Sequence, residues 1–136
     1  ADERNGYDMT YSTIAGTGHF LPDEILTNVE LEKRVKTNDE WIRERTGIFE
    51  RRIAPVGESS ATMGTKAALN ALEAAAMKPE QIDLILVATS TPDRIFPSTA
   101  CLIQHALGIK NCPAFDISAA CAGFNYALSV ADQYIR

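Results

Sequence analysis

The feature that most constrains the fold is the run Leu84 to Thr89, in which apolar residues follow one another without polar alternation. A strand with one face in water alternates apolar and polar side chains, whereas a strand covered by helices on both faces does not. We therefore predict a buried strand over Leu84–Thr89, of the kind found in parallel sheets. A second short run, Ala114 to Ile117, predicts another strand.

Helical patterns surround these two strands, with cap residues at their beginnings and stop signals at their ends. The predicted helices run from Ser59 or Ser60 to about Met77, from Ser98 or Thr99 to Leu107, and from Cys121 to Arg136. Alanines dominate one face of the first helix, which indicates close approach to a neighbouring element. The last helix is predicted to bury the face formed by Phe124, Leu128, Ala131 and Ile135. This alternation is typical of a layered α/β fold, with helices packed on a parallel or mixed sheet.

The first part of the chain is less regular. Residues 1–8 are predicted to be an extension or a remnant left by expression, with Met9 as a candidate natural start. The predicted elements are a strand over Met9–Gly18, helices over Val29–Val35 and Trp41–Arg45, and an exposed strand over Ile48–Ile53. We expect one domain over 9–136 that is incomplete at its C-terminal end. The last helix lacks a C-cap, and a sheet of two or three strands is too small for helices to cover both of its faces.

Cys121 lies where the second strand gives way to the last helix. Unpaired N–H groups and the positive end of the helix dipole favour a thiolate at a helix N-terminus. The small neighbours Ala119, Ala120, Ala122 and Gly123 leave room for a substrate to approach the sulfur. The functional hypothesis is a nucleophile that carries an acyl group as a thioester. The alternative is a small buried cysteine that only fills space.

Charge and composition exclude several classes of function. The net charge is −5, and basic residues form no stripe, so a nucleic-acid partner is not expected. No apolar run approaches the roughly 20 residues that a membrane-spanning helix needs. The chain has three cysteines, without paired spacing, which argues against a disulfide framework or a zinc site. A reducing cytoplasm is the simplest setting.

Four segments closely resemble the β-ketoacyl-[acyl-carrier-protein] synthase III family, condensing enzymes of the thiolase-like superfamily. These segments are residues 16–18, residues 38–42 with 45–48, residues 96–98 and residues 112–124. The resemblance implies the N-terminal half of a duplicated, layered thiolase-like fold, usually found as a homodimer. The C-terminal half of the same protein is then expected to complete it.

The resemblance also implies roles for individual residues. Cys121 would take a short acyl group from acyl-CoA, with acetyl-CoA as the expected donor. A malonyl group on the acyl-carrier protein would then be decarboxylated, and its carbanion would attack the thioester to start type II fatty-acid synthesis. Trp41 and Arg45 match residues at the mouth of the CoA tunnel, and Phe96 matches a residue that crosses the dimer interface into the partner's acyl pocket. Acyl-CoA is a substrate here, and neither a cofactor nor a metal is implied.

The residues alone support these roles more weakly. Trp41 and Arg45 stand four positions apart on a predicted helix, so an indole and a guanidinium can grip one ligand, including its phosphate. The alternatives are a core tryptophan beside a solvated arginine, and an ordinary core aromatic at Phe96. The family's catalysis also needs a histidine and an asparagine from the second half. His19 and His105 match no such motif, so this chain alone is expected to be inactive.

Two other classes of function stay open. One is a superfamily acyltransferase that moves acyl groups without forming a carbon–carbon bond. The other is a non-catalytic thiolase-like partner protein, against which the presence of Cys121 argues.

Overall fold

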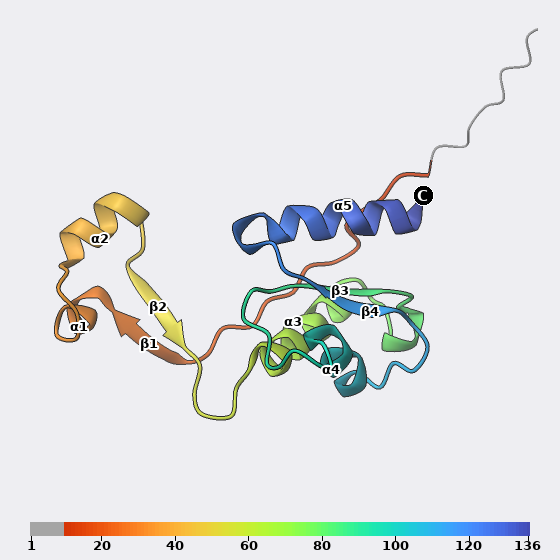
Figure 1. Ribbon diagram of the computed structural model, residues 1–136, viewed down its shortest axis with the longest axis horizontal. Coiled ribbons are helices and arrows are strands. Elements are labelled where there is room, and N and C mark those ends of the chain that lie inside the picture. The colour runs from red at the N-terminus through yellow and green to blue at the C-terminus, as the bar shows by residue number, and fades with distance from the viewer. Residues whose placement is uncertain (1–9) are drawn as a thin grey trace, which may run out of the picture. The chain divides into compact units, whose positions relative to one another are not determined.

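The computed structural model describes residues 10–136, which form two compact units (Figure 1). Residues 10–19 and 60–136 make up the larger unit, and residues 20–59 make up the smaller one. Each unit has its own sheet and helices. The predictions for residues 1–8 and for a start at Met9 lie outside the described residues.

The larger unit has three layers, with a two-stranded parallel sheet between helices (Figure 1). Its elements are α3 (Ser60–Ala74), η1 (Pro79–Gln81), β3 (Ile85–Ala88), α4 (Thr99–Ala106), β4 (Ala114–Ile117), η2 (Ala120–Ala122) and α5 (Gly123–Ile135). Helices α3 and α4 pack together on one side of β3 and β4, and α5 packs against β3 on the other. The predicted layered α/β architecture and both predicted strands are confirmed. Strand β3 is half-buried instead of fully buried, because the described residues pair it with β4 alone.

The alanine face of α3 makes the close approach that the sequence predicts. A Cβ atom added to Gly16 would lie 2.6 Å from the carbonyl oxygen of Ala71, and one added to Gly18 would lie closer still to that of Ala67. The backbone of the N-terminal segment therefore runs directly against the helix. The predicted strand over Met9–Gly18 is wrong for its described part, since residues 10–19 contact α3 without pairing with a strand.

Helix α5 turns only part of the predicted face towards the sheet: Ala131 and Ile135 line a hollow with Leu84 and Leu86, whereas Phe124 and Leu128 do not. A Cβ atom added to the buried Gly123 would lie 3.3 Å from Cβ of Ala88, so the first residue of the helix lies close against β3. The prediction that Phe124, Leu128 and Ile135 are buried is wrong, because their side chains are 68%, 46% and 52% exposed.

The smaller unit pairs two short antiparallel strands with two short helices. Its elements are β1 (Glu24–Thr27), α1 (Asn28–Glu32), α2 (Asp39–Thr46) and β2 (Glu50–Ile53). Thr27 and Glu30 form the capping box of α1, and the helix ends at Glu32, before the predicted end at Val35. Gly47 ends α2 with φ of 70°, a left-handed conformation that favours glycine. Strand β1 is absent from the sequence prediction.

Among the described residues, no helix is long and apolar enough to cross a membrane.

Candidate functional site

Cys121 lies on an exposed turn between β4 and α5. The turn is the 3-10 segment η2, and Cys121 precedes the first residue of α5, Gly123, by two positions, so the predicted helix start at Cys121 is too early. The preceding Ala120 has φ of 44°, in the left-handed region where a non-glycine residue costs roughly 1–3 kcal/mol. Such strain is often retained where function needs it. The Cys121 thiol is free and exposed, so the alternative of a space-filling buried cysteine does not fit.

Asp116 fixes the strand that leads to this turn. Its two carboxylate oxygens accept hydrogen bonds from the backbone N–H groups of Thr99 and Ala100, each at 2.8 Å. These groups belong to the first turn of α4, where N–H groups lack partners within the helix and the helix dipole favours an anion. Asp116 therefore joins β4 to the beginning of α4.

Phe96 lies in the loop that enters α4. Its side chain is 86% exposed, so it is not an ordinary core aromatic. The peptide bond between Phe96 and Pro97 is cis. The loop is fastened to α3 by two contacts: the Asp93 carboxylate accepts from the Ala61 N–H at 3.2 Å, and Ser60 Oγ donates to the Thr91 carbonyl at 2.9 Å. The loop therefore presents an exposed aromatic side chain from a base held by hydrogen bonds.

Trp41 and Arg45 lie together on α2 in the smaller unit. The Arg45 guanidinium carbon lies 5.9 Å from the centroid of the Trp41 ring, within cation–π range. Trp41 is 54% exposed, which excludes a core-packed tryptophan. Its backbone N–H donates to Oδ1 of Asn38, the N-cap of α2, at 2.7 Å. The pair therefore offers a flat ring and a cation to the same ligand.

The sites predicted from the sequence fall into two groups. Cys121 and Phe96 belong to the larger unit, and Trp41 and Arg45 belong to the smaller one. A hollow of about 300 Å³ adjoins Trp41, lined also by Lys36, Thr37 and Asn38.

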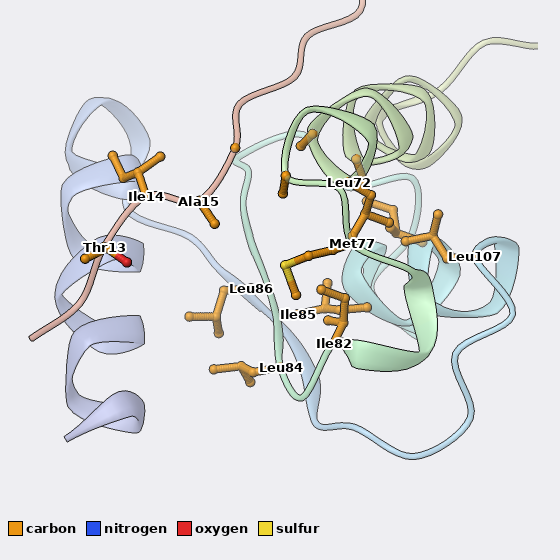
Figure 2. A pocket seen from close by; sticks show the side chains of 15 residues that line it. Thr13, Ile14, Ala15, Leu72, Met77, Ile82, Leu84, Ile85, Leu86 and Leu107 are labelled. Carbon is orange, nitrogen blue, oxygen red and sulfur yellow. The ribbon is translucent and has the colours of Figure 1, made fainter. Parts of the chain in front are cut away.

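The larger unit also contains an apolar cavity of about 420 Å³ (Figure 2). It lies between the N-terminal segment at Ile14, α3 at Leu72 and β3 at Leu86. Its lining holds no ionisable side chain and no cysteine, and Thr13 supplies its one hydroxyl. The cavity is therefore a packing feature of the layers, separate from the Cys121 turn.

The two histidines lie away from any predicted motif, and both are exposed. His19 ends the described N-terminal segment, and its carbonyl accepts from Asn70 Nδ2 at 2.8 Å. His105 lies in the last turn of α4. Among the described residues, no group of three or more His, Cys, Asp or Glu side chains could hold a metal ion.

The sequence reasoning missed two residues that hold candidate site residues in place, Asp116 in the larger unit and Asn28 in the smaller one. Asp116 is the one charged residue within β4, which was a signal that its side chain needs a partner. Asn28 carried no comparable signal, since its hydrogen-bond partners lie 11 to 23 positions away.

Comparison with known proteins relates this chain to condensing enzymes. It is 58% identical over 125 residues to β-ketoacyl-[acyl-carrier-protein] synthase III of Methylococcus capsulatus, a match that covers 92% of this chain and 39% of that protein. The crystal structure of 3-oxoacyl-[acyl-carrier-protein] synthase III from Aquifex aeolicus superposes with a TM-score of 0.86 at 57% identity, over 90% of this chain and 39% of that chain. No family model matches the sequence.

A more distant neighbour is the priming β-ketosynthase of the R1128 polyketide biosynthetic pathway. It superposes with a TM-score of 0.86 at 41% identity, over 90% of this chain and 37% of that chain. The chain thus spans well under half the length of the proteins that it matches.

Proposed function

Since this chain corresponds in sequence and in fold to part of the β-ketoacyl-[acyl-carrier-protein] synthases III, we propose that it carries the acyl-bearing half of such an enzyme's active site. The observation that carries the proposal is the free, exposed Cys121 on a strained turn between β4 and α5. A cysteine in that position can be reached by a thioester substrate.

The proposed reaction has two steps. The Cys121 thiolate attacks the thioester carbonyl of an acyl-CoA, expected to be acetyl-CoA, and the CoA thiolate leaves. The malonyl group on an acyl-carrier protein then loses carbon dioxide, and the carbanion attacks the acyl–Cys121 thioester. A carbon–carbon bond forms, Cys121 leaves as the thiolate, and a 3-ketoacyl-carrier protein is released.

The other site residues have supporting roles in this proposal. Trp41 stacks on the adenine of CoA, and Arg45 pairs with a phosphate, which suits its charge and planar shape. The exposed Phe96 reaches a second copy of the protein and lines its acyl pocket, as in a homodimer. The free thiols of all three cysteines suit a reducing, cytoplasmic setting.

The chain by itself is proposed to lack condensing activity. Decarboxylation needs groups that stabilise charge on the malonyl thioester carbonyl as carbon dioxide leaves. The histidine and asparagine that do this in the family are expected from the remainder of the full-length protein. An acyltransferase that forms no carbon–carbon bond is the competing function, since it would use the same cysteine.

Incubation of the full-length protein with acetyl-CoA and malonyl-acyl-carrier protein tests the proposal. We expect the 3-ketoacyl product, detected by mass spectrometry, and its loss in Cys121→Ala. Acyl transfer to the carrier protein without release of carbon dioxide would instead support the competing acyltransferase. Product formation by Cys121→Ala at the wild-type rate would contradict the proposed nucleophile.

A further inference from the structure

The Asn28 side chain makes three hydrogen bonds within the smaller unit. It is 1% exposed. Its Nδ2 donates to Asp39 Oδ1 at 2.8 Å and to the Ile48 carbonyl at 2.8 Å, and its Oδ1 accepts from Arg51 Nη2 at 2.9 Å. A buried amide is costly unless its donors and acceptor are paired, and here both N–H groups and the oxygen are used.

The two partners of Nδ2 lie at opposite ends of α2. Asp39 is the first residue of the helix, and Ile48 follows its Gly47 cap. One side chain therefore fixes where α2 begins and where the chain leaves it. Trp41 and Arg45, the pair assigned to acyl-CoA, lie between these two points.

The third partner connects this arrangement to the sheet. Arg51 lies in β2, where it pairs with Leu26 of β1, the buried strand residue of this unit. Arg51 Nη1 is buried without a hydrogen-bond partner among the described residues, so this side chain depends on the Asn28 oxygen. The amide thus holds α2 against a framework that is fixed by strand pairing.

We propose that Asn28 is a positioning residue for the acyl-CoA site, holding α2 by both ends so that Trp41 and Arg45 face one ligand. The inference deepens the proposed function and rests on it, since it takes Trp41 and Arg45 as the residues that bind acyl-CoA. Asn28 itself touches no reacting atom. It acts by removing the freedom of α2 to shift or unwind before the ligand arrives, which lowers the entropic cost of binding.

The variant Asn28→Asp in the full-length protein removes the two hydrogen bonds that this side chain donates and keeps the one that it accepts. A carboxylate still accepts from Arg51, but it cannot donate to Asp39 or to the Ile48 carbonyl. We expect KM for acetyl-CoA to rise about tenfold with kcat nearly unchanged. We also expect amide hydrogen exchange over residues 41–47 to accelerate by about tenfold while exchange in α3 is unchanged.

Rescue distinguishes positioning from a general loss of stability. The double variant Asn28→Asp/Asp39→Asn places an amide donor at position 39 opposite the new carboxylate. It restores the hydrogen bond between positions 28 and 39 with the direction reversed, so KM should return to within about threefold of wild type. Asn70→Asp is the matched control, because it changes the same chemical group at an exposed site whose partner is the His19 carbonyl. It should leave KM for acetyl-CoA unchanged.

A milder variant covers the case in which Asn28→Asp fails to fold. The Asp39 side chain is 37% exposed, so Asp39→Ala removes one tie without leaving a deep cavity. It should raise KM about threefold and accelerate exchange in α2. Folded variants with wild-type KM and wild-type exchange in α2 would overturn the proposal.

KM values for variants of the binding pair and of Asn28 separate failure of the inference from failure of the proposed function. If Trp41→Ala and Arg45→Ala leave KM for acetyl-CoA unchanged, the assignment of acyl-CoA to α2 is wrong, and Asn28 has no ligand site to position. If those variants raise KM while Asn28→Asp does not, the proposed function stands and the positioning role is wrong.

Discussion

The Asp116 carboxylate binds the backbone of Thr99: Oδ2 accepts a hydrogen bond from the Thr99 N–H at 2.8 Å. Oδ1 accepts one from the Ala100 N–H at the same distance. Asp116 lies in the strand that leads to Cys121, and Thr99 opens the helix that follows the Phe96 loop. The Asp116 carboxylate therefore connects β4, which precedes the proposed nucleophile, to the first turn of α4, which follows the loop that carries Phe96.

The first prediction concerns this contact. Asp116→Asn keeps the size of the side chain but offers a single acceptor oxygen to two N–H groups, so one of them loses its partner. We expect the full-length protein to lose about 1–3 kcal/mol in urea denaturation and acylation of Cys121 to slow. Ser98→Ala is the control, since it removes the neutral N-cap of the same helix and should cost about 1 kcal/mol without slowing acylation. Equal acylation rates in the two variants would contradict a special role for Asp116.

The second prediction concerns α2. Arg45→Ala should raise KM for acetyl-CoA by roughly fivefold, because it removes both a cation and the ring contact with Trp41. Arg43→Ala is the comparison on the same helix, since the Arg43 guanidinium lies over the Phe49 ring at 4.4 Å and pairs with Asp39 at 3.4 Å instead of contacting Trp41. Steady-state kinetics with varied acetyl-CoA measures both variants. A comparable rise in KM for Arg43→Ala would indicate a general charge effect.

The third prediction concerns acid stability. Hydrogen bonds from the backbone N–H and the hydroxyl of Thr27 lower the pKa of Glu30 below its ordinary value of 4.5. Because the folded-state pKa is lowered, the stabilisation is present above pH 4.5 and is lost as the pH falls through the lowered value. We expect thermal unfolding of Glu30→Gln to depend less on pH across this acid range than that of wild type. Thr27→Ser, which keeps the hydroxyl, should retain the wild-type dependence; an unchanged profile in Glu30→Gln would refute the coupling.

The fourth prediction concerns the contact between the N-terminal segment and α3. Gly18→Ala would place a Cβ atom against the backbone of Ala67 and Ala71, neither of which can rotate away. We expect a loss of about 1–3 kcal/mol in the free energy of unfolding, as for other overpacked sites. The exposed Thr17→Ala should change stability by less than about 0.5 kcal/mol. Equal midpoints for both variants in denaturant would show that the segment does not pack on α3.

The location of Cys121 could be predicted because local patterns flank it. Apolar runs predict the two parallel strands, and capping residues predict the helices. The sequence therefore predicts a junction between β4 and the next helix. The 3-10 turn could not be predicted, because alanine at position 120 gives no sign that it adopts a left-handed conformation.

The orientation of α5 and the network around Asn28 depend on contacts that are distant in sequence. Periodicity favours burial of Phe124 and Leu128, but both are exposed, and the contact of Gly123 with Ala88 of β3 is not contained in any single-helix pattern. Asn28 likewise stands next to an ordinary capping box, and its bond to Arg51 spans 23 positions. Side-chain networks of this kind emerge only once the strands are paired.

The central claim is that Cys121 carries the acyl group. Mass spectrometry of the peptide that contains Cys121, after incubation of the full-length protein with acetyl-CoA alone, measures this directly. The account predicts an acetyl adduct on that peptide, with none on the peptides that contain Cys101 or Cys112 and none in Cys121→Ala. An unmodified Cys121 peptide in a protein that still forms the 3-ketoacyl product would contradict it.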